Sequence, residues 1–415
     1  MSKVREGYKQ TKVGMIPEDW EVVTLKNILS KNIQNGYSPI CPEKDTGHWI
    51  LGLGALSREE KLNISDRKPA PSNDDKVKQF ILEENDFLIS RANTPERVGF
   101  SGVFRSNEKI YSYPDLMMRF RVSEELVDID YMENCLKSFR VLRYLQSSAA
   151  GSSSSMVKIN KKVVENIKFP LPPLKEQQKI AQILTTWDQA ISKQEALIVA
   201  KEQLKKGLMQ KLLSGEVRFD GFDGEWEEIA LKKVLKERKT FLEKGLDLEH
   251  VSLTTEGVVP KSARYERDFL VKGDNKKYKI TRLDDICYNP ANLKFGVICR
   301  NTLGDGIFSP IYVTFEVKKD FDISFISYLL TWNDFIQRVR KYEQGTVYER
   351  MAVSPKDFLL YKVKLPSKQE QQKIAKALTT ADKEIELLKN ELEALKEQKR
   401  GLMQKLLTGE VRVKR

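Results

Sequence analysis

The sequence has 415 residues, of which 40% are hydrophobic and 9% aromatic, so it is long enough for two or more folded domains. The chain shows no apolar run that could span a membrane and no signal peptide, and its four scattered cysteines and two isolated histidines exclude a disulfide framework or a His/Cys metal cluster, so we expect a cytoplasmic protein. The net charge of +12 is spread thinly along the chain and favours a polyanionic ligand only modestly.

Residues 1–170 are expected to form a first variable domain that mixes strands and helices. It opens with a Trp20-Glu21 pair that is followed by a Leu25-Lys26 pair. The pattern predicts strands at Phe87–Ser90, Gly102–Phe104 and Leu116–Val122, and a helix over Asp130–Gln146. A loop of small residues follows that helix and consists of Gly151, Ser152, Ser153, Ser154 and Ser155.

The apolar pattern of residues 171–217 predicts one long helix with a single apolar stripe. The stripe consists of Ile180, Leu184, Trp187, Ile191, Ile198, Leu208 and Leu212. Gly215 lies where a C-terminal cap is expected. Polar residues interrupt the stripe at Gln194, Lys201 and Lys205. We therefore expect additional helices from a partner protein to complete a bundle, with Leu184 and Ile191 at the contact.

Residues 218–364 repeat the first domain in outline. Trp226-Glu227 and Leu231-Lys232 match the opening pairs of the first domain at an offset of 206 residues. The pattern predicts strands at Ile286–Tyr288, Gly296–Cys299 and Ile311–Val317, a helix over Ile323–Tyr342, and a loop at Gly345-Thr346. Between the shared residues, the two domains differ widely in sequence.

Residues 365–415 contain a second copy of the helical segment. Leu171–Arg218 and Leu365–Arg412 are identical at 26 of 48 positions without a gap, at an offset of 194 residues. The second apolar stripe consists of Ile374, Leu378, Ile385, Leu388, Leu392, Leu402 and Leu406. Gly207 and Gly401 lie inside the predicted helices and indicate either a close crossing of the two backbones or a local kink.

Two helices of this kind in one chain most simply pack antiparallel, with the variable domains at opposite ends and a pseudo-twofold axis between them. The predicted fold class is therefore α+β, with two pseudo-twofold-related α/β domains separated by two long antiparallel coiled-coil helices.

Basic and aromatic residues near the predicted loops are candidate contacts to a nucleic acid, because arginine and lysine bind phosphate groups and can read base edges. For any single residue, an ordinary solvated charge is the competing interpretation. The candidates are Lys158, Lys161, Lys162, Lys261, Arg264, Tyr265, Lys276, Lys277, Lys279, Arg338 and Arg340.

Motifs for catalysis are missing from the sequence. There is no GxxxxGK[ST] phosphate loop and no GxGxxG after a predicted strand. Asn289-Pro290-Ala291 approaches the site of a DNA methyltransferase but lacks its second proline and its aromatic residue. We therefore expect no catalytic residue and no metal site in this chain.

The paired motifs resemble those of the specificity subunits of type I restriction–modification enzymes. The resemblance is carried by two PxxEQQKIA-like helix starts, two GLMQKLL[ST]GEVR helix ends, and the openings GMIPEDWEVVTLKNIL and FDGEWEEIALKKVL. It covers nearly the whole chain, and the doubled layout is highly specific.

This resemblance implies that each variable domain is a target-recognition domain for one half of a split double-stranded DNA site. It further implies that the helices act as a spacer and dock modification subunits, of which two are expected. Restriction subunits would bind through these, and S-adenosylmethionine, ATP and Mg²⁺ would be bound by the partner subunits. By position, the loops near DNA would include Tyr37, Ser38 and the Gly151–Ser155 loop, with Thr346 in the counterpart of the latter.

The second domain lacks a GYSP stretch and has Gly257-Val258-Val259-Pro260 instead, so we expect the two halves to read different sequences. Two other functions remain open at this point. A coiled-coil scaffold would bind protein and not DNA, and an independent DNA-modifying enzyme would need the cofactor motifs that the sequence lacks.

Overall fold

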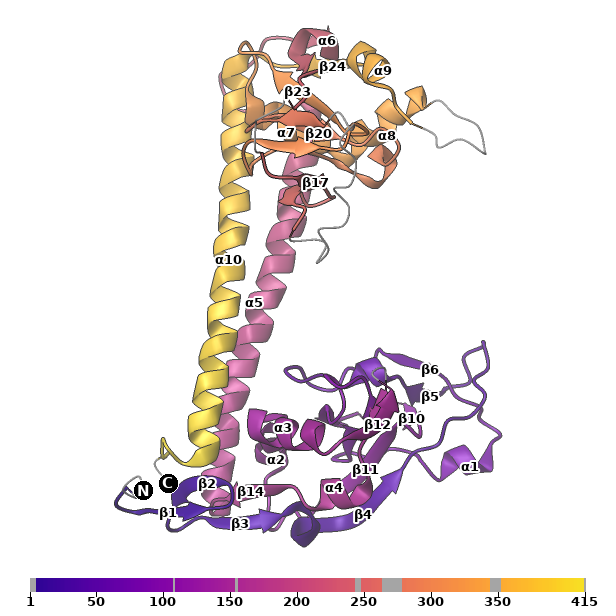
Figure 1. The fold of residues 1–415 in the computed structure, drawn as a ribbon, viewed down its shortest axis with the longest axis vertical. Helices are drawn as coiled ribbons and strands as arrows, with labels where there is room; N and C mark the ends of the chain where they lie inside the picture. The colour runs from indigo at the N-terminus through magenta and orange to yellow at the C-terminus, as the bar shows by residue number, and fades with distance from the viewer. Residues whose placement is uncertain are drawn as a thin grey trace. The chain divides into compact units, whose positions relative to one another are not determined.

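The chain folds into two compact units, each with one variable domain and half of each long helix. The computed structural model describes residues 5–106, 109–153, 156–242, 248–262, 278–343 and 352–413. Unit 1 consists of Met1–Glu195 and Glu391–Arg415, and unit 2 of Ala196–Asn390. The boundary falls inside the long helices α5 (Leu174–Ser214) and α10 (Lys368–Thr408), shown in Figure 1. The four segments expected from the sequence are consecutive in the chain. The compact units are not, because unit 1 combines the first part of the chain with its last part.

A four-stranded antiparallel sheet, with strand order β4-β11-β7-β9, forms the centre of the first domain. Smaller sheets join β10, β5 and β6, and β12, β13 and β8. The strands are β1 (Tyr8–Thr11), β2 (Gly14–Pro17), β3 (Glu21–Thr24), β4 (Leu29–Asn35), β5 (His48–Leu51), β6 (Arg67–Pro69), β7 (Phe87–Ser90), β8 (Ala92–Asn93), β9 (Ser101–Val103), β10 (Ile110–Ser112), β11 (Met117–Val122), β12 (Ala150–Ser153), β13 (Met156–Lys158) and β14 (Lys168–Leu171). The short helices are η1 (Leu25–Ile28), η2 (Leu53–Ala55), α1 (Asp75–Lys78), α2 (Ile129–Lys137), α3 (Phe139–Ser147) and α4 (Lys161–Glu165).

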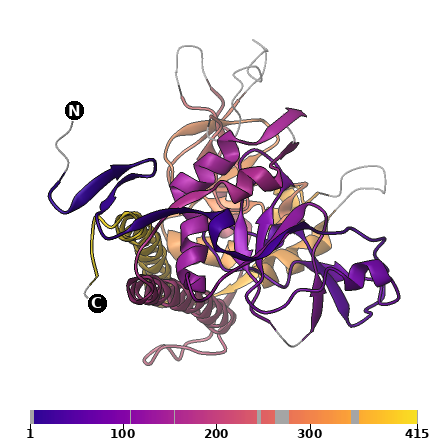
Figure 2. The same cartoon turned by 90° about the horizontal axis from the view of Figure 1, so that it is seen from below.

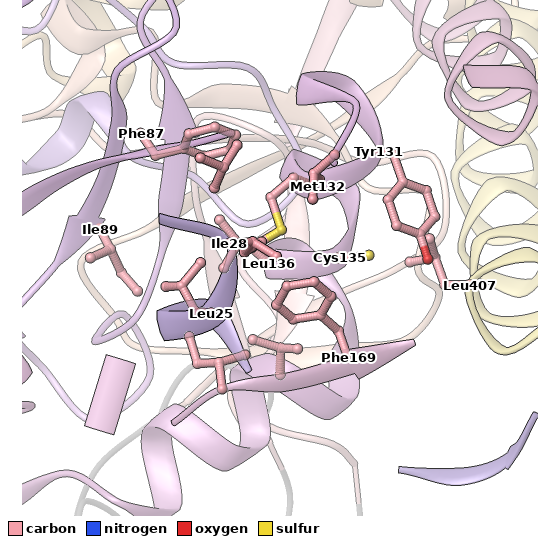
Figure 3. Close-up of a cluster of buried hydrophobic side chains, with 14 of the residues drawn as sticks. Leu25, Ile28, Phe87, Ile89, Tyr131, Met132, Cys135, Leu136, Phe169 and Leu407 are labelled. Carbon is pink, nitrogen blue, oxygen red and sulfur yellow. The ribbon is translucent and has the colours of Figure 1, made fainter. Parts of the chain in front are cut away.

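One apolar core joins the main sheet, helix α2 and both long helices within unit 1. Figure 3 shows Met132 and Leu136 of α2 together with Phe87 of the sheet and Phe169 of β14. Leu407 of α10 belongs to the same buried cluster. Burial of each large apolar side chain contributes roughly 1.5–3 kcal/mol to the free energy of folding. The long-helix residues in this core therefore help to stabilise the domain that they adjoin.

The second domain repeats the main sheet of the first. Its strand order, β16-β23-β20-β21, corresponds to β4-β11-β7-β9, and the pair β15-β24 corresponds to β3-β14. Its strands are β15 (Glu227–Ala230), β16 (Leu235–Glu237), β17 (Val251–Leu253), β18 (Val258–Pro260), β19 (Lys279–Thr281), β20 (Ile286–Tyr288), β21 (Ile298–Arg300), β22 (Gly306–Phe308), β23 (Val313–Val317) and β24 (Lys362–Leu365). Its short helices are α6 (Leu231–Val234), η4 (Leu293–Phe295), α7 (Ile323–Thr331), α8 (Asn333–Val339), η5 (Arg340–Tyr342) and α9 (Pro355–Leu360).

The strand predictions agree with the structure within two residues at each end, but both helix predictions in the variable domains are wrong. Each expected single helix is divided in two. At Ser138 the backbone is extended (φ −61°, ψ 145°), and its hydroxyl accepts a hydrogen bond from the backbone N–H of Val141 in α3. Trp332 occupies the equivalent position in unit 2, also with an extended backbone. The apolar periodicity continues across each break and conceals it in the sequence.

The halves of α5 and α10 run antiparallel within each unit, as the sequence predicts. In unit 1, Asp188 pairs with Lys399 and Glu195 with Lys396. Stripe residues at the outer ends are buried in the domain cores: Ile180, Leu184 and Leu406 in unit 1, and Leu212, Ile374 and Leu378 in unit 2, while Leu402 and Leu208 pack against these cores. Ile385 is buried, and Trp187, Ile191, Leu388 and Leu392 are half-buried.

Acidic residues of α10 face the polar interruptions of the first stripe. The ammonium group of Lys201 lies 2.5 Å from Glu384, Lys205 pairs with Asp382, and the side-chain amide of Gln194 donates to Glu391 over 3.2 Å. The interruptions therefore have partners within the chain and do not themselves require helices from another protein. Leu184, which is fully buried in the core of unit 1, is also no surface contact for a partner.

The close crossing of backbones considered for Gly207 and Gly401 is wrong. Apart from the neighbouring backbone of the same helix, no atom of the described residues lies within 4 Å of a Cβ placed at either glycine. The cap prediction is confirmed, because Gly215 and Gly409 follow the helices with positive φ angles of 76° and 72°.

In both units, an arginine that follows one long helix pairs with a glutamate in the first turn of the other. In unit 1, Arg412 binds Glu176 at 2.7 Å and Asp19 at 2.9 Å. In unit 2, Arg218 binds Glu370 at 2.7 Å. These arginine–glutamate pairs are related by the 194-residue offset of the repeat. The repeated EQQ and GEVR motifs therefore meet in each unit: EQQ lies in the first turn of one long helix, and GEVR directly follows the other.

The two ends of the chain meet within unit 1. The hydroxyl of Tyr8 donates to the carbonyl oxygen of Gly409 over 2.8 Å. Figures 1 and 2 both show β1 and β2 beside the C-terminal end of α10. The first and last segments of the sequence thus complete one domain.

Candidate nucleic-acid interface

The loop that begins at Gly36 is held against the turn before β11. The backbone N–H of Gly36 donates to Met117, and that of Tyr37 to Tyr113, over 3.0 and 3.1 Å. A Cβ at Gly36 would lie 2.2 Å from the carbonyl oxygen of Pro114, so only glycine allows this approach. The Lys76 ammonium lies 4.2 Å from the centre of the Tyr37 ring, which therefore has a positively charged neighbour.

Ser38 belongs to a polar network on the surface of unit 1. Its hydroxyl donates to the Asp115 carboxylate over 2.5 Å and accepts from the Asp115 backbone N–H over 3.2 Å. The Arg91 guanidinium donates to the carbonyl oxygen of Asp115 over 3.3 Å. Ser38 and Asp115 are exposed and Arg91 is half-buried. The network therefore presents donors and acceptors to an incoming ligand.

The serine-rich hairpin adjoins this network. Strand β13 pairs with β8, so that Lys158 lies opposite Ala92 and Val157 opposite Asn93. The backbone N–H of Ile159 donates to the carbonyl oxygen of Arg91 over 2.9 Å. The structure thus brings together the two loops that the family resemblance singles out in the first domain.

Three candidate lysines of the first domain lie on the same hairpin or in the helix that follows it. Lys158 is exposed on β13, and Lys161 and Lys162 are exposed in the first turn of α4. For Ser152 and Ser153 only the backbone is described, and Ser154 and Ser155 lie outside the described residues.

Sequence reasoning missed Arg91, Asn93 and Asp115. Arg91 lies between β7 and β8, Asn93 ends β8, and Asp115 lies in the turn before β11; none of these short segments carries a distinctive motif. The pairing of β8 with β13 brings the turns to the hairpin, and this pairing joins residues about 65 positions apart in the chain. These residues are therefore brought together by long-range contacts that leave no local pattern in the sequence.

The candidate residues of the second domain differ in whether their charges are already paired within the protein. Lys279 is buried 3.7 Å from Glu237, so its charge is already neutralised. Arg338 pairs with Asp334 at 2.7 Å but remains exposed, and Arg340 donates to Glu343 and Gln337. Lys261 follows β18. Arg264, Tyr265, Lys276, Lys277 and Thr346 lie outside the described residues.

A groove of about 1090 Å³ lies beside the long helices of unit 1. Its wall includes Phe139 and Arg140 of α3, Ile191 of α5 and Met403 of α10. Phe139 is 61% exposed. Burial lowers the pKa of Arg140, whose guanidinium donates to the carbonyl oxygen of Lys168 over 2.9 Å. The groove thus offers apolar surface beside a cation.

Within the described ranges, no group of three or more His, Cys, Asp and Glu side chains could hold a metal ion. None of the helices there is long and apolar enough to cross a membrane. All four cysteines are free.

The family model described as "Type I restriction modification DNA specificity domain" matches residues 17–200 and 298–397. The chain belongs to this family. The match includes the Gly36 loop, the serine hairpin, most of α5 and most of α10. The family resemblance stated for the sequence is therefore confirmed.

Relatives that match over nearly the whole length of the chain agree with this assignment. The type I restriction enzyme specificity subunits MjaX and MjaVIII of Methanocaldococcus jannaschii are each 27% identical, over 99% of this chain and 97% of their own. The S subunit of a type I restriction–modification system from M. genitalium shares the fold with a TM-score of 0.51, at 15% identity and 98% coverage of both chains. A chain from a study of the assembly of the type I R-M system gives 0.59, at 15% identity, covering 95% of this chain and 99% of its own.

As a member of the type I restriction–modification DNA specificity family, the chain is a sequence-specific DNA-recognition component. The alternative of a scaffold that does not bind DNA receives no support from these similarities. The expected fold class, with two α/β domains and long antiparallel helices, is that of the family.

Proposed function

We propose that this specificity chain reads an asymmetric, two-part double-stranded DNA site, one half per variable domain, and recruits modification subunits and, through them, restriction subunits. The observation that carries the proposal is the repeated frame around unlike surfaces. The Glu176–Arg412 and Glu370–Arg218 pairs recur at the same offset. The residue that follows the central strand differs, because Arg91 in unit 1 corresponds to Pro290 in unit 2.

The polar network of Ser38, Asp115 and Arg91 supports DNA reading in unit 1. Arginine and serine side chains can bind both phosphate oxygens and base edges, and a carboxylate can accept a hydrogen bond from cytosine. The neighbouring lysines of β13 and α4 would bind phosphate groups and position the domain without reading sequence.

The catalytic steps are proposed to occur on other subunits. S-adenosylmethionine would bind to the modification subunits, of which we expect two, and ATP and Mg²⁺ to the partner subunits that cut and move DNA. We expect the purified chain alone to transfer no methyl group to DNA, and its complex with the modification subunits to do so. Methyl transfer by the chain alone would contradict this division.

Binding of the chain–modification complex to DNA tests the central claim. Sites obtained by methylation mapping of the host genome should contain two unlike specific segments separated by a fixed gap. Affinity for such a site should fall steeply between low and moderate salt, because phosphate contacts release counterions. A single continuous site, or affinity that does not depend on sequence, would contradict the proposal.

The exposed apolar groove of unit 1 supports recruitment of a protein partner. We expect Ile191→Asp to weaken co-purification of the modification subunit, because a charge would replace half-buried apolar surface. Gln178→Asp, at an exposed position of the same helix, is the control. Equal co-purification of both variants with the modification subunit would show that the groove is not used.

A further inference from the structure

Two large apolar side chains are exposed at one end of the main sheet of unit 2. Strands β20 and β23 place Tyr288 opposite Val313, where β20 ends and β23 begins. Phe295 lies in the loop that follows β20 and is 66% exposed, and Ile311 lies in the turn before β23 and is 61% exposed. Both residues therefore belong to segments that adjoin the same end of the sheet.

The loop that carries Phe295 is held in place by its own hydrogen bonds. The side-chain oxygen of Asn289 accepts from the backbone N–H of Ala291 over 3.1 Å. Leu293, which is fully buried, anchors the 3-10 turn η4, and its carbonyl oxygen accepts from Gly296 over 2.8 Å. Gly296 closes the turn with a φ of +77°, a conformation that favours glycine. Phe295 thus stays exposed on a fixed turn.

The equivalent place in unit 1 is the polar network of the candidate interface. The backbone N–H of Val353 donates to Pro290, as that of Ile159 donates to Arg91, and Val353 and Ile159 are 194 residues apart. The strand pairing makes Val313 of β23 equivalent to Met118 of β11, so Ile311 corresponds to Leu116, the neighbour of Asp115. Where unit 1 has an arginine and a carboxylate, unit 2 therefore has Pro290 and Pro310, and the exposed Ile311 follows Pro310 directly.

A cationic side chain lies beside Phe295 in unit 2. The Lys294 ammonium lies 5.1 Å from the centre of the Phe295 ring. Helix α8 packs against η4 and carries the exposed Arg338. An apolar contact among cations fits a polyanion that also offers apolar groups. DNA does so in its major groove, where the only apolar substituent on a base edge is the methyl group of thymine.

We propose that Phe295 and Ile311 contact thymine methyl groups, so that the half-site read by unit 2 is recognised partly through thymines. This inference rests on the proposed function and names the base chemistry of one half. In unit 1, the corresponding contacts are hydrogen bonds from the Arg91 and Asp115 region. The two half-sites are therefore distinguished by chemistry as well as by sequence.

Replacing thymine by uracil removes the methyl group and leaves the base-pairing atoms unchanged, which makes it a direct probe. The site obtained by methylation mapping is synthesised with single dT→dU replacements in each half, and binding of the chain–modification complex is measured. Replacements at one or two positions of the unit 2 half should weaken binding about three- to fivefold, the loss that corresponds to about 0.8 kcal/mol for one buried methyl-sized group. Replacements in the unit 1 half should leave binding within twofold.

Variants assign the effect to the two side chains. Phe295→Ala and Ile311→Ala complexes should bind the all-thymine site more weakly and lose their sensitivity to dU at the affected positions. Leu283→Ala is the matched control, because Leu283 is 56% exposed in the turn before β20, at the opposite end of that strand. It should retain wild-type affinity and dU sensitivity.

Sequence-specific binding by the wild type without any effect of dU in the unit 2 half would overturn this inference and leave the proposed function intact. The same holds if Phe295→Ala keeps full dU sensitivity. Absence of sequence-specific DNA binding by the wild-type complex would instead overturn the proposed function itself.

Discussion

At the scale of single residues, buried ion pairs explain why the glutamate of EQQ and the arginine of GEVR occur in both copies of the repeat. Glu176 is fully buried and meets Arg412 from the far end of the chain, and Glu370 meets Arg218 in the same way. Removing one member of such a pair leaves a buried charge without its counterion, and that loss is more costly than the pair is stabilising.

Arg412→Ala should destabilise unit 1 by about 2 kcal/mol, because Glu176 loses a bidentate partner while part of the arginine side chain was exposed. Urea denaturation monitored by hydrogen exchange checks this. Exchange should increase in unit 1 and stay unchanged in unit 2. Arg218→Ala is the control and should show the reverse pattern; a global change in both variants would contradict independent units.

His48 should make stability depend on pH. Burial lowers its pKa below the ordinary value of 6.5, so the unfolded state takes up the proton first. The stabilising contribution of neutral His48 is therefore present above about pH 6.5 and is lost as the pH falls below that value. We expect His48→Gln to reduce the slope of unfolding free energy against pH between 7 and 5 in urea titrations. An unchanged slope would show that other groups cause it.

At the scale of elements, the start of each long helix fixes the helix pair of its own domain. The side-chain oxygen of Gln177 accepts from the backbone N–H of Asp128, which caps α2, and its amide donates to Leu126 and Pro172. Gln371 accepts from Asp322 in unit 2 in the same way. The second glutamine of each motif, such as Gln178, is exposed.

Gln177→Ala should therefore cost roughly 3 kcal/mol, because it leaves buried backbone groups at the start of α2 and α5 without hydrogen bonds. Gln178→Ala should change stability by less than about 0.5 kcal/mol. Thermal unfolding of both variants is the measurement. Similar melting temperatures for the two would mean that water replaces the lost bonds.

At the scale of the whole molecule, two continuous helices connect residues of both units. Deleting 196–202 and 384–390, which lie opposite each other, removes one heptad from each helix and shortens both by roughly 10 Å. If the helices act as a spacer, the gap in the preferred DNA site should shorten by about three base pairs at 3.4 Å each. Selection of bound sequences from random DNA checks this; an unchanged gap would refute the spacer role.

Features that depend on local order could be predicted from the amino-acid sequence. The repeat, the apolar stripes, the caps at Gly215 and Gly409 and the main strands could be predicted, because periodicity and turn chemistry act between residues a few positions apart. The same patterns left the breaks at Ser138 and Trp332 hidden, since apolar spacing continues through them.

Which distant segments meet was visible in the folded chain alone. The tertiary structure brought Arg412 to Glu176, paired Lys201 with Glu384, and joined the Ser38 loop to the serine hairpin through Arg91. It also showed that Lys279 is neutralised and that Phe295 is exposed. These outcomes depend on contacts between residues tens to hundreds of positions apart, where packing of the whole core selects the partner and no local pattern records it.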